Sequence, residues 1–199
     1  GAEISHDSLQ DMHMRALDDT QLKAKILQGD DERIFAVYEA LFRGWTIQEL
    51  HELTMIDEWF LAKLLHLCQL EKRMTSEPLT PALLTELKEC GFPDKTISRI
   101  SGQSEFTRLP YSYKMVDTCG AEFEAETPEF YSTYGEEDEA KEFLAHVENR
   151  KPVVMVFGSG PIRIGQGIEF DYASVHCVWA LKEAGYEVVI VNNNPETVS

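Results

Sequence analysis

The sequence predicts a mainly α-helical bundle domain followed by a truncated α/β unit of one strand, one helix and one strand. The first observation is a series of short amphipathic segments between about residues 17 and 108, each with its own start and stop signals. The second is a pair of continuous apolar runs, residues 153–157 and 187–191, typical of parallel strands buried on both faces. The third is a glycine-rich loop and a helical segment between these runs, as in a right-handed crossover unit.

Capping signals divide the N-terminal part into separate helices. Asp31 is expected to cap one of them, and Gly44 stands where a helix commonly ends in a left-handed glycine. The apolar face of this helix is expected to contain Ile34, Val37, Tyr38 and Leu41. Further helix starts are expected at Thr46 with Glu49, Asp57, Thr80 with Pro81, and Asp94.

The helical period disappears after Tyr111, so residues 111–150 are expected to connect the two parts. Residues 111–116 suit a short strand, and the alternation in residues 122–126 suits one exposed face of another. A polar helix is expected over residues 136–148. We therefore place the helical domain with its connecting segment at residues 1–150 and the α/β unit at residues 151–199.

Charge and cysteine usage exclude several classes of function. The formal net charge is −17, with nine acidic residues and a single base between Ala121 and Glu142, so nucleic acid and membrane surfaces are not expected as partners. The four cysteines share no CxxC spacing, which predicts no metal site and fits a reducing cytoplasm. A helix-turn-helix reader of DNA is disfavoured because the candidate helices carry Glu49, Glu52, Glu58, Glu86 and Glu89.

The loop after the first apolar run matches neither of two familiar phosphate-binding motifs. A dinucleotide fingerprint needs a glycine where Arg163 stands and an acid where Asn192 follows the second run. A P-loop needs Lys and then Ser or Thr where Gln166 and Gly167 stand. From these residues alone the loop is either an anion site with Arg163 as its fixed positive charge or a tight packing of strand on helix.

Several stretches of the chain, in the same order, resemble the large subunit of the carbamoyl-phosphate synthase family. The loop GSGPIRIGQGIEFDY and the later NNNPETVS resemble the opening of the second synthetase half of that family. The stretch VDTCGAEFEA with YSTY resembles the segment that precedes this half. The stretches DERIFA and IDEWFL are similar to the family's oligomerisation domain.

The resemblance implies a parent enzyme that makes carbamoyl phosphate from bicarbonate, ammonia from glutamine and two ATP, for arginine and pyrimidine biosynthesis. It implies MgATP as the parent's cofactor, a glutaminase subunit or domain as partner, and self-association through the helical domain. Residues 151–199 are then the start of a Rossmann-like pre-ATP-grasp domain. Because the ATP-grasp fold is not in this sequence, we expect no catalytic residue here and no activity of the chain alone.

The resemblance also implies that the glycine loop lies near the carbamate-phosphorylation site. Arg163 is expected to steer carbamate, while Gln166, Glu169 and Asn192 hold the loop or contact substrate. The full set of candidates is Gly158, Gly160, Arg163, Gly165, Gln166, Gly167, Glu169, Asn192, Asn194 and Glu196.

Two other interpretations stay open at this point. One is part of an oxidoreductase that uses a nicotinamide cofactor, which the missing glycine and the asparagine run disfavour. The other is a helical assembly or adaptor module with a non-catalytic unit that resembles a nucleotide-binding fold, which the glycine loop opposes.

Overall fold

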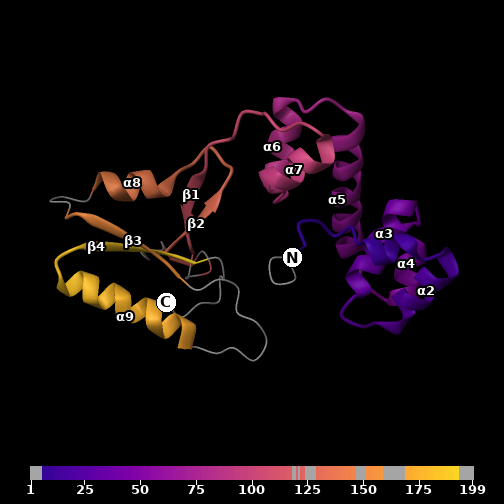
Figure 1. Ribbon diagram of the computed structural model, residues 1–199, viewed down its shortest axis with the longest axis horizontal. Helices are drawn as coiled ribbons and strands as arrows, with labels where there is room; N and C mark the ends of the chain where they lie inside the picture. The colour runs from indigo at the N-terminus through magenta and orange to yellow at the C-terminus, as the bar shows by residue number, and fades with distance from the viewer. Residues whose placement is uncertain are drawn as a thin grey trace. The chain divides into compact units, whose positions relative to one another are not determined.

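The computed structural model describes residues 6–117, 120, 122–123, 129–146, 151–158 and 169–192 (Figure 1). The chain forms two compact units. The first contains residues 6–112 and 132–136, and the second contains residues 113–131 and the chain from residue 137 onward. Helices followed by a strand–helix–strand unit confirm the predicted fold class.

The helical unit is built from short helices joined by tight turns (Figure 1). Their bounds are α1 Met12–Ala16, α2 Asp19–Gln28, α3 Arg33–Arg43, α4 Ile47–Thr54, α5 Glu58–Ser76, α6 Pro81–Glu89 and α7 Asp94–Ser101. None of the helices in the described part of the chain is long and apolar enough to span a bilayer.

Most of the predicted caps are confirmed. Thr46 and Glu49 form a reciprocal capping box at the start of α4, and Gly44 ends α3 with φ 103°, a left-handed conformation that favours glycine. The predicted cap at Asp31 is wrong. The N-cap of α3 is Glu32, which makes no side-chain capping bond, and the Asp30 carboxylate instead accepts the Glu32 N–H at 3.1 Å.

We expect Thr46→Ala to lower the free energy of unfolding of the helical unit by about 1 kcal/mol, because it removes the hydroxyl that accepts the Glu49 N–H. Urea unfolding followed by circular dichroism measures this loss. Gln48→Ala, at an exposed position of the same helix, is the matched control. Equal midpoints for the two variants would contradict the cap.

Two groups of buried apolar side chains form the core of the helical unit, and α5 contributes to both. Partly buried Leu67 packs against both groups. The first group contains Met14, Leu22, Ile26, Ala36, Val37, Tyr38, Ala40, Leu41, Leu50, Leu61 and Cys68. The second contains Leu70, Met74, Leu83, Leu84, Leu87, Phe92 and Ile97.

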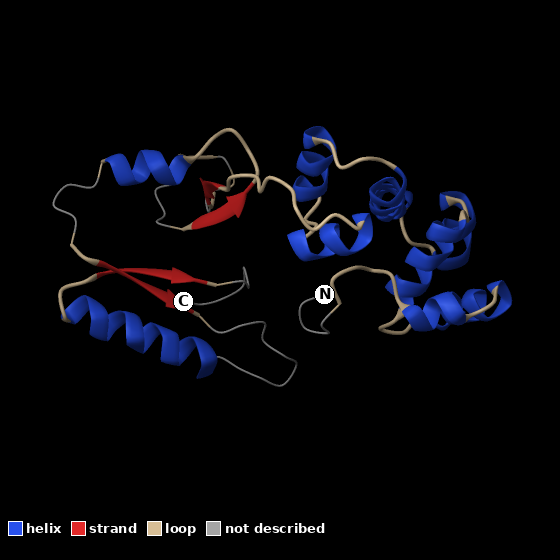
Figure 2. Cartoon of the chain, turned by 45° about the horizontal axis from the view of Figure 1, so that its top comes forward, coloured by secondary structure: helices blue, strands red, loops and turns tan. Residues whose placement is uncertain are grey.

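The second unit contains the predicted strand–helix–strand arrangement. Its strands and helices are α8 Glu139–Ala145, β3 Val153–Phe157, α9 Glu169–Glu183 and β4 Glu187–Val191. Strands β3 and β4 pair in parallel, with Val153 opposite Glu187 and Phe157 opposite Val191, and α9 lies against this pair (Figure 2). A two-stranded sheet, β1 Ser112–Met115 and β2 Phe130–Thr133, lies between the helical bundle and α8 in sequence.

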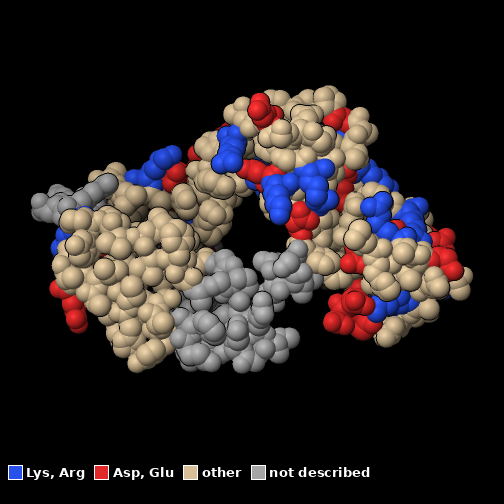
Figure 3. Space-filling model, in the orientation of Figure 1, with Lys and Arg blue, Asp and Glu red and all other residues tan. Residues whose placement is uncertain are grey.

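Strands β3 and β4 are not buried on both faces, which corrects the expectation from their apolar runs. Val153, Met155 and Phe157 are 57%, 56% and 76% exposed, because alternate side chains point away from α9. The side of the α9 region seen in Figure 3 carries few charged side chains. Strand β3 therefore has apolar side chains that the described residues do not bury.

Candidate functional site

The first candidate site lies where β3 and β4 end. Gly158 follows β3, and its N–H donates to the Val191 carbonyl of β4 at 2.9 Å. A Cβ atom added to Gly158 would lie 1.6 Å from Oδ1 and 2.7 Å from Cγ of Asn192. The absence of a side chain at Gly158 thus lets the Asn192 amide pack directly on the backbone. Carboxyl ends of parallel strands are where open α/β sheets bind ligands.

Among the candidates whose surroundings the structure describes, it brings together Gly158 and Asn192. Glu169 is the first residue of α9, but its side chain is outside the described part of the structure. The remaining candidates lie outside the described residues: Gly160, Arg163, Gly165, Gln166, Gly167, Asn194 and Glu196.

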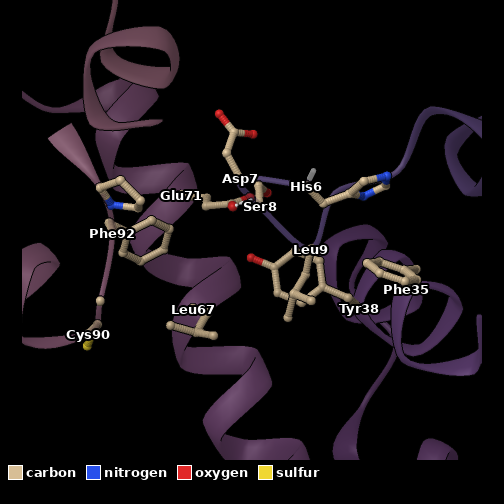
Figure 4. Close-up of a pocket in the computed structure, with 12 residues that line it drawn as sticks. His6, Asp7, Ser8, Leu9, Phe35, Tyr38, Leu67, Glu71, Cys90 and Phe92 are labelled. Atoms are coloured by element: carbon tan, nitrogen blue, oxygen red, sulfur yellow. Dashed lines mark hydrogen bonds between the residues drawn. The ribbon is translucent and has the colours of Figure 1, made fainter. Parts of the chain in front are cut away.

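A second candidate is a pocket of about 290 Å³ within the helical unit (Figure 4). One side is formed by the N-terminal segment, residues 6–9, and the others by α3, α5 and the turn after α6. Its lining residues are His6, Asp7, Ser8, Leu9, Phe35, Tyr38, Leu67, Glu71, Cys90, Gly91, Phe92 and Pro93.

A buried carboxylate, Glu71 of α5, is the central polar group of this pocket. It is 2% exposed and accepts hydrogen bonds from the Ser8 hydroxyl at 2.6 Å and the Gln10 amide at 2.5 Å. The N-terminal segment is held at a second point, where Thr96 donates to the Asp7 carbonyl at 3.1 Å and Arg99 pairs with the Asp7 carboxylate at 2.9 Å. These bonds close the segment over the helices.

Burial and the Glu71 charge make the neighbouring groups hard to ionise. Burial is the main cause that raises the pKa of the Tyr38 phenol far above its ordinary range, and Cys68 and Glu71 add to it. Burial likewise raises the pKa of the Cys68 thiol to about 12. Both groups are therefore neutral near pH 7, and Tyr38 presents a hydroxyl rather than an anion beside the pocket.

The pocket was not predicted from sequence. The Ser8 hydroxyl and the Glu71 carboxylate are 63 positions apart, and no local pattern connects them. The one available signal was an acidic residue at a helical position between apolar neighbours, Leu70 and Met74. Throughout the described ranges, no group of three or more His, Cys, Asp and Glu side chains is placed to hold a metal ion.

Comparison with known proteins gives the same family for both parts of the chain. Residues 1–110 match the domain family described as "Carbamoyl-phosphate synthetase large chain, oligomerisation domain". Residues 150–199 match "Carbamoyl phosphate synthase preATP-grasp domain".

Curated relatives match nearly the whole chain. The carbamoyl phosphate synthase large chain of Agathobacter rectalis is 47% identical over 201 residues, which cover 97% of this chain. That of Lachnoclostridium phytofermentans is 44% identical over 206 residues, which cover 99%. The aligned region spans 18% of the length of each relative.

A helical unit followed by a parallel strand pair, together with these two matches, defines a segment of a synthetase large chain, a class of ligase. The chain belongs to the carbamoyl-phosphate synthetase large-chain family.

Proposed function

We propose that the helical unit mediates self-association of a carbamoyl-phosphate synthase large chain. The observation that carries this proposal is the match of residues 1–110 to a domain described by its role in oligomerisation. The helical unit itself supports the proposal, because it has its own core and still exposes large apolar side chains. Leu27, Trp59 and Phe60 are 54%, 60% and 58% exposed.

The proposal extends to the reaction of the intact enzyme. The intact enzyme makes carbamoyl phosphate from bicarbonate, glutamine-derived ammonia and two ATP. It acts in the cytoplasm, with a glutaminase subunit or domain as partner. The strand-end site of Gly158 and Asn192 then belongs to the carbamate-phosphorylating half, where Arg163 would meet an anion. MgATP supplies the phosphoryl group, and we assign its binding to parts of the relatives beyond this chain. The chain alone is then inactive.

Solution mass tests the self-association. We expect light scattering over a concentration series to show a dimer or larger species that dissociates on dilution. Glu substitutions at Leu27, Trp59 and Phe60, tested singly, identify the surface, and at least one of them shifts the dissociation to higher concentration. A strict monomer at every concentration would contradict self-association by this unit alone.

A matched set of substitutions distinguishes this association from pairing through the open strands. Met155 and Phe157 of β3 are exposed to a similar degree, 56% and 76%. Because the proposed interface lies in the helical unit, replacing them by Thr is expected to leave the mass unchanged. Thr is chosen since it keeps the strand preference and removes apolar surface. A loss of the dimer in these variants, with none in the helical variants, would move the interface to the second unit.

A further inference from the structure

We propose that the pocket within the helical unit binds a small organic cation, an alkylammonium whose charge meets Glu71 and whose apolar body lies against the aromatic walls. This site is distinct from the strand-end site, and it does not depend on self-association. The inference rests on three features of the pocket: a buried charge without an ion-pair partner, walls that suit a cation with an apolar tail, and a contact between the N-terminal segment and α5 that a ligand would reinforce.

The buried charge is the first step. Glu71 receives hydrogen bonds from the neutral side chains of Ser8 and Gln10, and the neutral Tyr38 phenol is a further hydrogen-bonding neighbour. Within the described residues Glu71 forms no ion pair with Lys, Arg or His. A carboxylate buried without a counter-ion is costly, even when neutral donors bond to it. A ligand ammonium beside Glu71 would supply the missing charge and add a charge-assisted hydrogen bond.

Neighbouring cationic side chains are engaged elsewhere. Arg99 pairs with Asp7, the other carboxylate of the pocket lining. Lys72, which follows Glu71 on α5, has its ammonium 4.8 Å from the centre of the Phe42 ring. His6 packs its ring on Phe35, with 5.3 Å between centroids. The negative charge of Glu71 is therefore available to a ligand.

The walls fit a cation with a short apolar tail. Leu9, Leu67 and Phe92 provide the apolar surface, as Figure 4 shows around Glu71. Phe35 and Tyr38 add aromatic rings, whose faces attract cations. A volume of about 290 Å³ is at the lower end of ligand pockets and selects a small molecule. An anionic ligand is excluded by Glu71 and Asp7.

The N-terminal segment would respond to such a ligand. Residues 6–9 line the pocket, and the same segment donates to Glu71 through Ser8. A bound cation would therefore contact both the segment and α5 and hold them together. The position of the N-terminal segment is thereby coupled to ligand concentration.

The test uses the whole chain and n-butylammonium chloride as the probe. Methyl shifts of Leu9 and Leu67 are followed by two-dimensional NMR, with n-butanol as the neutral probe of matched shape and with salt concentration held constant. We expect saturable shifts with a dissociation constant on the order of millimolar, since so small a ligand has few atoms to contribute. Butanol is expected to bind at least about tenfold more weakly.

Two variants test whether the Glu71 carboxylate binds the ammonium group. Glu71→Gln keeps the shape of the side chain and is expected to weaken butylammonium binding about tenfold or more, to the level of butanol. Glu58→Gln, an exposed position on the same helix, is the control and should leave binding unchanged. Circular dichroism establishes that each variant is folded.

The comparison of the two probes on the unmodified chain keeps the proposal testable if Glu71→Gln does not fold. Equal shifts with butylammonium and butanol would show an apolar cavity without charge selection and would overturn the proposal. An absence of saturable shifts with butylammonium would overturn it as well, as would undiminished binding by a folded Glu71→Gln variant.

Discussion

Leu41→Ala is expected to lower the free energy of unfolding of the helical unit by about 3 kcal/mol, a large part of the stability of a small domain. Leu41 is 0% exposed and belongs to the first core group, which contains side chains of α1, α2, α3, α4 and α5. Its removal leaves a cavity that neighbouring side chains fill only in part, so both the transfer and the cavity terms are lost.

Ile34→Ala is the matched control. Ile34 lies on the same helix and in the same apolar series in the sequence, but it is 45% exposed. We expect it to cost about 1 kcal/mol or less, because little apolar surface returns to water. Urea unfolding of the two variants measures the difference, provided that the slope with denaturant is unchanged. Equal losses would contradict the burial of Leu41 in the first core group.

This pair of residues shows what sequence periodicity can and cannot predict. Spacing identified the apolar stripe of α3 correctly at Val37, Tyr38 and Leu41. It could not give the width of the stripe that neighbouring helices cover, and so it placed exposed Ile34 in the core. Phe60, an apolar residue near the start of α5, is likewise 58% exposed. Burial depends on partners distant in sequence, which spacing does not contain.

Local chemistry predicted the ends of several elements better than it predicted their surroundings. Strands β3 and β4 have the predicted bounds, and the caps at Thr46, Asp57 and Thr80 are confirmed. Each of these signals lies within a few residues of the element that it ends or starts. The short elements α1 and β2 were not predicted, because five and four residues contain too few positions to show a period.

The two candidate sites also differ in how far the sequence could predict them. A run of glycines marks the strand-end loop in the sequence. Of the candidates at this loop, Gly158 and Asn192 are the two whose surroundings the structure describes. The Glu71 pocket has no local motif, and it depends on contacts between residues 6–10 and α5. Motifs therefore indicate where a loop approaches a ligand, whereas an isolated buried charge is found only from the fold.

Gly158→Ala is expected to lower the protection of the Gly158-position amide against hydrogen exchange about tenfold or more, because its Cβ would lie 1.6 Å from Asn192 Oδ1. The Asn192 side chain must rotate away from residue 158, so it no longer packs beside the bond from the residue 158 N–H to the Val191 carbonyl. Gly135→Ala is the control, since its Cβ would meet only the Ser112 hydroxyl oxygen, at 3.8 Å. Equal exchange rates of the residue 158 amide in the two variants would contradict the packing of Asn192 on Gly158.

A second substitution separates the steric effect from any contact of Asn192 with substrate. Asn192→Ala removes the obstructing amide, so the double variant with Gly158→Ala should recover most of the lost protection, a coupling that a double-mutant cycle measures. The single variant Asn192→Ala, placed in a full-length large chain, then tests the proposed function. Lower kcat/KM for carbamoyl phosphate formation with unchanged exchange would assign Asn192 to substrate or loop positioning. Unchanged kcat/KM would restrict Asn192 to packing at the strand ends.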